Sequence, residues 1–295
     1  MELRNLRYFV AVAREENMTK SANQLHVTQP TLSKALKKLE SELGKKLFIR
    51  HAFRIELTDE GILLQKRAQD LLAMADKIEQ EFQGINEVTG GDVYLGMAES
   101  YQVRYLARFI KDFRQKYPDF RYHILSGDTN QVNEKLDKGI LDFTVLAQKP
   151  DALKYDYFAL PQEDSWGLVL PQSDRLAQKE YITYDDLKNL PLFISNQAIK
   201  NDFANWCSEK QLAELNFEGT FQLSYNGSIF VKEGLGYLLT FEHLIATTEL
   251  GLVFKPLVPK LTTTLYVAWR KHQTFTPIAK LFLEEMQATW QVDPS

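Results

Sequence analysis

The stretch TKSANQLHVTQPTLSKALKKLE, residues 19–40, predicts two helices joined by a tight turn and ends in a run of lysines. Apolar side chains recur at helical spacing in and just before its first part, at Met18, Ala22 and Leu25, with Thr19 as the expected N-cap. A compact basic surface is therefore expected near the start of a chain whose net charge is −4.

The second helix of this stretch begins after a break at His26–Val27. Thr28 can cap this helix, and Pro30 fits its first turn, where a missing N–H leaves no hydrogen bond unmade. Its expected buried stripe consists of Leu32, Ala35, Leu36, Leu39 and Leu43. Its opposite face is polar and carries Gln29, Thr31, Ser33, Lys34, Lys37, Lys38 and Ser41.

That polar face has the composition of a DNA-recognition helix. Glutamine, threonine and serine at a helix start can reach base edges in a major groove, and the lysines behind them suit phosphates. Past Gly44, KKLFIRHAFRIELT (45–58) predicts two short strands around a turn at His51–Phe53, as in the wing of a winged helix-turn-helix. The predicted DNA-binding residues are Thr28, Gln29, Pro30, Thr31, Ser33, Lys34, Lys37, Lys38, Arg50 and Arg54.

A lysine run alone favours the solvated face of a plain helical subdomain. The order of elements is more restrictive: an amphipathic helix over Leu6–Ala13, a short helix, a tight turn, a capped helix and a basic hairpin. This order favours a DNA-binding domain over residues 1–58, which we call the head.

Charge is distributed unevenly along the chain. Residues 1–58 hold eleven Lys/Arg and six Asp/Glu, a net charge of +5, which leaves −9 for the remainder. Only the head is thus expected to meet a polyanion. The single cysteine, Cys207, excludes an internal disulfide, and neither a secretory signal nor an apolar run of membrane-spanning length is visible. These features predict a cytoplasmic protein with no membrane partner.

The head resembles the N-terminal domain of the LysR-type transcriptional regulators. The shared positions are Ala22, Leu25, Gln29-Pro30, Ser33, Leu39-Glu40, Leu43-Gly44, Leu47-Phe48, Arg50, Leu57-Thr58 and Gly61. Lys34 and Lys37 stand where the family usually carries arginine, so they lack the bidentate fork that recognises guanine. The resemblance implies a sequence-specific regulator that binds double-stranded promoter DNA, contacts RNA polymerase and forms homodimers or homotetramers.

A heptad pattern follows the head and predicts a linker helix over residues 59–89. Its apolar positions alternate steps of four and three residues: Leu64, Ala68, Leu71, Ala75, Ile78, Phe82 and Ile85. Packing against its own domain is one explanation of such a seam. The resemblance favours the other, since LysR-type regulators pair through this helix, and the first six positions are the predicted dimerisation residues.

Strands and helices alternate over residues 90–295, which we call the body. DVYLGMA, FRYHIL and LDFTVL are predicted strands, separated by helices through Leu106–Phe113 and over 130–138, which implies a parallel sheet. A second lobe is predicted to contain the strands SWGLVLP, PLFIS, TFQLS and YLLT, with helices through Phe203 and near 228–234. LYVAWRK and a helix through Ile278–Met286 then return to the first lobe.

The resulting fold class is an α+β winged helix-turn-helix head, a long linker helix and a two-lobed α/β effector domain. The body resembles periplasmic solute-binding proteins, with lobe I at about 90–161 and 265–295 and lobe II at about 162–264. Ligands of open α/β sheets bind beyond the strand ends, and the resemblance places a small-molecule effector between the lobes. The predicted effector-binding residues are Ser100, Gln102, Asp128, Thr129, Ser195, Asn196, Gly227 and Ser228.

These residues lie at four turns, 100–102, 127–130, 195–197 and 225–228. Each turn taken alone fits a plain helix cap, but the four together favour a cleft. Glu99 and Asp128 stand beside them and no arginine does, which argues against a simple carboxylate effector. The five histidines are scattered without metal-ligand spacing, so neither a metal nor a cofactor is predicted. Two rival functions are a solute-transport protein, which leaves the basic head unexplained, and an enzyme, for which Glu99 and Asp128 are the candidate pair.

Overall fold

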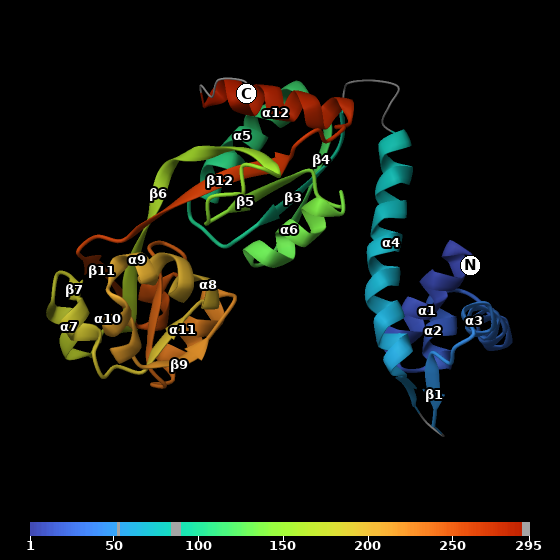
Figure 1. Cartoon of the computed structure of the whole chain (residues 1–295), viewed down its shortest axis with the longest axis horizontal. Helices are drawn as coiled ribbons and strands as arrows, with labels where there is room; N and C mark the ends of the chain where they lie inside the picture. Colours follow the sequence, from blue (N-terminus) through green and yellow to red (C-terminus); the bar gives the residue numbers. More distant parts are fainter. Residues whose placement is uncertain (52–53, 84–89, 291–295) are drawn as a thin grey trace. The chain divides into compact units, whose positions relative to one another are not determined.

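The computed structural model describes residues 1–51, 54–83 and 90–290, without the side chains of Arg50, Gln80, Glu81 and Gln83. The chain divides into two compact units, Met1–Gln83 and Gly84–Ser295 (Figure 1). The first holds the head and the linker helix, and the second holds the body.

Three helices form the head: α1 (Leu3–Glu15), α2 (Met18–Gln24) and α3 (Gln29–Leu43). As predicted, Thr28 caps α3, and its hydroxyl accepts a 3.4 Å hydrogen bond from the Thr31 N–H. The cap predicted for α2 is wrong. Asn17 takes that place and accepts from the Lys20 N–H at 2.9 Å, because α2 begins at Met18, one residue before Thr19.

The head core lies between α1, α3 and the linker helix. Its fully buried side chains include Leu6, Phe9, Val12, Leu32, Leu36 and Leu39. The predicted stripe of α3 is thus confirmed for three leucines. Leu43 is exposed instead, since the helix ends there and Gly44 turns the chain away at φ 66°.

The predicted hairpin is present as β1 (Phe48–Arg50) and β2 (Ile55–Leu57), paired antiparallel with Phe48 opposite Leu57. Part of the turn predicted between them, residues 52–53, lies outside the described residues. The buried carboxylate of Glu40 accepts from the Leu47 N–H at 2.9 Å and so ties α3 to the segment that leads into β1.

The linker helix α4 spans Asp59–Gln83, and the predicted heptad seam divides along it. Near its start, Leu64, Ala68 and Leu72 pack into the head core. On another face of the helix, Leu71, Ile78 and Phe82 are 41%, 46% and 70% exposed. Packing on the helix's own head therefore accounts for part of the predicted seam. Pairing with a second copy stays a prediction for the apolar face that the single chain leaves uncovered, and Ile85, the last predicted position, lies outside the described residues.

Lobe I of the body is built on the three parallel strands β3 (Gly90–Met97), β4 (Asp119–Ser126) and β5 (Phe143–Leu146). Helices α5 (Val103–Lys116) and α12 (Pro277–Thr289) cover one face of this sheet, and α6 (Thr129–Asp137) covers the other (Figure 1). Phe282 of α12 is fully buried and contacts the rings of Phe109, Phe113, Phe120 and Phe143.

Two antiparallel strands connect the lobes. The strand β6 (Tyr155–Pro171) runs through both lobes, and β12 (Thr262–Arg270) returns beside it, with Thr262 opposite Ser165 and Arg270 opposite Tyr155. One sheet with the order β4-β3-β5-β12-β6-β10-β8-β9 results. The sequence predicted only the later part of β6, from Ser165 onward.

Lobe II contains the strands β7 (Ile182–Thr183), β8 (Leu192–Ile194), β9 (Phe217–Thr220), β10 (Tyr237–Phe241) and β11 (Leu252–Val258). Its helical segments are η1 (Arg175–Gln178), α7 (Tyr184–Leu187), α8 (Asn196–Ala198), the π-helical η2 (Ile199–Phe203), α9 (Ala204–Trp206), α10 (Glu209–Glu214), α11 (Ser224–Lys232) and η3 (Thr247–Leu250).

The strand predicted at residues 220–224 is wrong: β9 pairs with β8 over Phe217–Thr220, and the chain then turns into α11. As a result α11 begins at Ser224, ahead of the predicted helix near 228–234.

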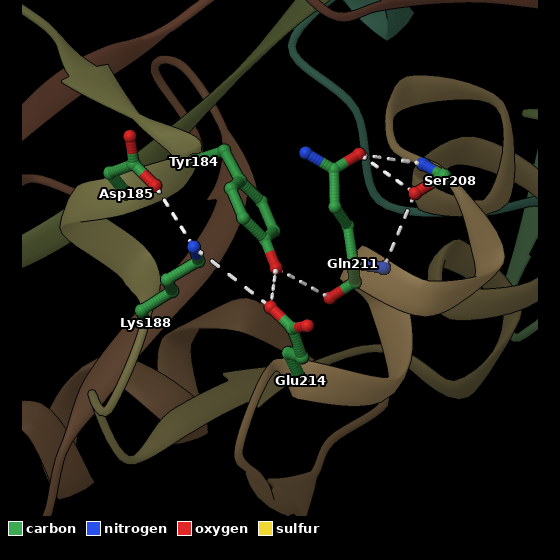
Figure 2. A network of polar contacts seen from close by, with 6 residues as sticks. All are labelled: Tyr184, Asp185, Lys188, Ser208, Gln211 and Glu214. Carbon is green, nitrogen blue, oxygen red and sulfur yellow. Dashed lines mark hydrogen bonds and ion pairs between the residues drawn. The ribbon is translucent and has the colours of Figure 1, made fainter.

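A polar network joins α7 to α10 at the periphery of lobe II (Figure 2). The Tyr184 hydroxyl lies 2.9 Å from the Gln211 carbonyl oxygen and 3.1 Å from Glu214 Oε2. Lys188 Nζ lies 3.1 Å from Asp185 Oδ1 and 4.9 Å from the centre of the Tyr184 ring. Ser208 and Gln211 form a capping box at the start of α10. The network thus holds two helices of lobe II together.

Candidate functional site

The exposed face of α3 is the first candidate site. Gln29, Thr31, Lys34, Lys37 and Lys38 are exposed, as are Thr28 and Pro30, while Ser33 is half-buried. The Thr28 hydroxyl lies 2.8 Å from the Thr31 hydroxyl, so these two side chains engage each other at the start of the helix. The face predicted from composition is therefore presented to solvent by a helix whose leucines anchor it to the head.

Ion pairs divide the basic side chains of the head into two groups. Lys38 Nζ lies 2.5 Å from Glu2 Oε1, and Arg54 pairs with Glu56. Among the described residues, Lys34 and Lys37 have no ion-pair partner, so their charges are free to meet a phosphate. The side chain of Arg50, also predicted to bind DNA, lies outside the described part of the chain.

A cavity of about 280 Å³ between the two lobes of the body is the second candidate site. From lobe I it receives residues that follow the strands β3, β4 and β5, as the rule for open α/β sheets predicts. From lobe II it receives residues at the ends of β8, β9 and β10, at the start of α11 and in η2. Its lining includes Glu99, Asp128, Gln148, Trp166, Ser195, Asn196, Asp202, Phe221, Ser224 and Phe241.

Three of the eight predicted effector residues, Asp128, Ser195 and Asn196, line this cavity. The Thr129 N–H approaches Gln197 Oε1, a lining residue, at 3.4 Å. The remaining four, Ser100, Gln102, Gly227 and Ser228, lie outside the lining.

The side chains of Ser100 and Gln102 turn toward β6. The Ser100 hydroxyl donates to Asp164, and Gln102 Nε2 donates to the Glu163 carbonyl oxygen at 3.2 Å. Gly227 and Ser228 are buried within α11, where the Ser228 hydroxyl donates to the Tyr225 carbonyl oxygen at 2.7 Å. The residue of α11 that lines the cavity is Ser224, the first residue of this helix.

Two carboxylates of the cavity bind helix N-termini. Glu99 Oε2 accepts a 2.6 Å hydrogen bond from the Ser224 N–H, and thereby links lobe I to the first residue of α11 in lobe II. Asp128 caps α6 and accepts from the Gln131 N–H at 2.9 Å. Both contacts satisfy donors that a helix start leaves unpaired, and both place a negative charge at the positive end of a helix.

A third carboxylate, Asp202, is half-buried on η2 and was not predicted to contribute. The Thr263 hydroxyl donates to Asp202 and accepts from Trp166 Nε1 at 2.8 Å. Burial raises the pKa of Asp202 above its usual value, and the hydrogen bonds from Thr263 and Trp166 oppose that rise. No local motif marks this residue, because β6 and β12 bring its partners from distant parts of the chain.

Asp164 lies on β6 between the lobes and is 1% exposed. Burial raises the pKa of its carboxyl group to about 6, although hydrogen bonds from Ser100 and Gln102 oppose the change. Cys207 is half-buried, its thiol donates to the Phe203 carbonyl oxygen, and burial raises its pKa. Such a thiol is less readily ionised than an exposed one, which agrees with a packing role.

Within the described residues, no three His, Cys, Asp or Glu side chains come together as possible metal ligands. None of the described helices is both long and apolar enough to cross a membrane.

Comparison with protein families identifies both parts of the chain. A model described as "Bacterial regulatory helix-turn-helix protein, lysR family" matches residues 3–62. A second, described as "LysR substrate binding domain", matches residues 86–291, which include every residue that lines the cavity.

Relatives match along nearly the whole chain. The Hca operon transcriptional activator HcaR of Escherichia coli (strain K12) is 30% identical over 284 residues, 92% of each chain. The uncharacterized HTH-type transcriptional regulator YvbU of Bacillus subtilis (strain 168) is 26% identical over 289 residues, 96% of this chain and 97% of its own. Among solved structures, CbnR, a LysR family transcriptional regulator, has a TM-score of 0.77 at 19% identity and covers 98% of this chain and 99% of its own, a likeness of fold.

Proposed function

Because this chain belongs to the LysR family of transcriptional regulators, with a DNA-binding helix-turn-helix and an effector-binding domain, we propose which of its surfaces perform each task. The exposed face of α3, with the wing, binds promoter DNA. The cavity between the lobes of the body binds the small-molecule effector. Binding to DNA is expected to change transcription, and no catalysis is proposed.

The observation that supports the DNA-binding surface is the order of exposed side chains along α3, with polar groups in the first turn and lysines after them. Gln29 and Thr31 lie exposed in its first turn, where they can reach base edges, while Lys34 and Lys37 follow without ion-pair partners among the described residues. Phosphate contacts position a protein on the duplex and make binding depend on salt, whereas base contacts confer sequence preference.

We further propose that two copies pair through α4. Leu71, Ile78 and Phe82 form an exposed apolar face on this helix, which a second copy of the same helix would cover. A two-fold dimer presents two recognition helices and therefore prefers a pseudo-palindromic site. Assembly into homotetramers, contact with RNA polymerase and a cytoplasmic location belong to the same proposal by analogy with the family.

The proposed mechanism of regulation is a population shift: an effector that binds one arrangement of the two lobes better than another increases the share of that arrangement. Catalysis is not part of this proposal, since Glu99 and Asp128, the candidate acid and base, are each held at a helix N-terminus. Incubation with a bound effector should therefore return it chemically unchanged.

A gel-shift and footprinting experiment tests the DNA-binding proposal. Purified full-length protein is expected to retard the DNA upstream of its own gene, to protect a pseudo-palindromic segment, and to lose affinity as salt rises. The same fragment with the protected segment scrambled is the control. Absence of salt-sensitive binding to any double-stranded fragment would contradict the proposal.

A further inference from the structure

The charge of the cavity between the lobes specifies the chemistry of its ligand. Three carboxylates, Glu99, Asp128 and Asp202, line this cavity, and among the residues that the structure describes no Lys, Arg or His lines it. We propose that the effector is a cation, specifically a small organic amine. This inference rests on the proposed function of the cavity and adds the class of ligand to it.

Two helix N-termini beside the cavity already bind carboxylates of the chain itself. A carboxylate effector in an α/β cleft would bind free N–H groups at helix N-termini. Here the chain's own carboxylates occupy two such ends: Glu99 on the Ser224 N–H of α11 at 2.6 Å, and Asp128 on the Gln131 N–H of α6 at 2.9 Å. An anion could bind at these two helix ends only by displacing a carboxylate, and it would meet like charge as it did so.

Asp202 lacks a cationic partner among the described side chains. Within the described part of the chain, no Lys, Arg or His forms an ion pair with Asp202, Glu99 or Asp128. Desolvation raises the pKa of Asp202, which makes its ionised form less favourable. An ammonium group beside it would stabilise that ionised form, because opposite charges attract more strongly where water is excluded.

The apolar part of the lining suits the body of such a ligand. Trp166, Phe221 and Phe241 belong to the lining, and the rings of Trp166 and Phe241 lie 4.4 Å apart. Aromatic faces attract ammonium groups and pack against apolar carbon skeletons. A compact amine with an aromatic or branched apolar body therefore matches both the volume of about 280 Å³ and the charge of the cavity.

Matched probes that differ only in charge test this inference. A panel of small primary amines is compared with the alcohols and carboxylates of the same skeleton, for example 2-phenylethylamine, 2-phenylethanol and phenylacetate. Binding to the full-length protein is measured by thermal shift and then by calorimetry, at one pH near neutrality and one ionic strength. At least one amine should bind about tenfold or more tightly than its matched alcohol, a difference of about 1.4 kcal/mol. Its matched carboxylate should show no binding.

Two outcomes would overturn the inference: a carboxylate or an alcohol that binds as tightly as its matched amine, or the absence of binding by every amine. Variants locate the site. Asp202→Asn and, independently, Glu99→Gln should each weaken amine binding about tenfold or more. Asp185→Asn is the matched control, because Asp185 lies outside the cavity on α7, and it should leave binding unchanged (Figure 2).

Footprinting separates this inference from the proposed function. If a carboxylate binds and alters the footprint, the regulator stands and the amine inference fails. If an amine binds in the cavity without altering the footprint or the DNA affinity, the class of ligand stands and its role as effector fails.

Discussion

Lys38 of α3 forms an ion pair with Glu2, the residue that precedes α1, with 2.5 Å between Nζ and Oε1. The N-terminal amine of Met1 lies 3.1 Å from Glu42, so the start of the chain is fastened to α3 at two points. The Glu2 carboxylate raises the pKa of Lys38 and remains its partner in free protein. To bind a DNA phosphate, Lys38 must first give up its ion pair with Glu2, whereas Lys34 has no such pair to break among the described residues.

Lysine substitutions on α3 should therefore differ in their effect on DNA binding. Lys34→Ala should weaken specific and non-specific binding together and lower the slope of log affinity against log salt by about 1. Lys38→Ala should act in the same direction but less strongly, since Glu2 competes for its charge. Affinities measured over a salt series by fluorescence anisotropy would show this order, and equal slopes for the two variants would refute it.

Gln29→Ala should have a different signature from the lysine variants. Loss of an amide that reaches base edges should weaken binding to the protected operator by about 1–3 kcal/mol and leave binding to unrelated DNA almost unchanged. Operator and scrambled fragments of equal length, compared in one buffer, measure this difference. A uniform loss on both fragments would assign Gln29 to the phosphate backbone instead.

The double variant Leu71→Asp with Ile78→Asp should abolish dimers. Both side chains are exposed in the single chain and lie seven residues apart, so they share one face of α4. Ile62→Asp is the matched control: Ile62 is 57% exposed on the same helix but lies nine residues from Leu71, on the opposite face. Light scattering should give a monomer mass for the double variant and the parent mass for the control. Dimers that survive the double substitution would show that α4 is not the interface.

Glu40→Ala should destabilise the head, because it removes the acceptor of the Leu47 N–H and leaves that buried donor unpaired. The expected cost is about 1–3 kcal/mol. Hydrogen–deuterium exchange of the peptide that contains Leu47 should report a matching loss of protection. Glu40→Gln keeps an acceptor at the same position and should lose less. If both variants exchange alike, the hydrogen bond is not what holds this segment.

Local patterns were sufficient for much of the fold. The cap at Thr28, the leucines of α3 and the parallel order of β3, β4 and β5 depend on neighbours within a few turns or on simple alternation. The local pattern predicted the wrong cap where two candidate residues lie close together. Asn17 and Thr19 are both good N-caps, and only packing decides which of them starts α2. The strand expected at 220–224 failed for the same reason, since pairing with β8 selects Phe217–Thr220.

The cavity was harder to predict than the fold. Its place beyond the strand ends follows from the topology, and Asp128, Ser195 and Asn196 were found in this way. Which way each side chain points depends on partners distant in the sequence: Ser100 turns to Asp164, sixty-four residues away, and Asp202 is held by Thr263. Such pairings exist only once β6 and β12 cross between the lobes.

Asp164→Asn should make the body less sensitive to pH. The folded state raises the pKa of Asp164 from 3.8 to about 6, so the folded state binds a proton more tightly than the unfolded chain. Its contribution to stability is therefore greatest in acid, falls as pH rises from about 4 to about 6, and is lowest above that range. A shift of this size corresponds to at most about 3 kcal/mol in the free energy of unfolding. The asparagine variant should regain this free energy near neutral pH but not below about pH 4.

Tryptophan fluorescence during urea unfolding measures this effect in the body alone, because all four tryptophans, Trp166, Trp206, Trp269 and Trp290, lie beyond residue 84. The difference in midpoint between variant and parent should open between about pH 4 and pH 6, following the titration of the buried acid. Asp112→Asn, on the exposed side of α5, is the control and should give no such difference. A difference that is constant with pH would show that Asp164 keeps one protonation state across this range, and that the contact with Ser100 has a purely structural role.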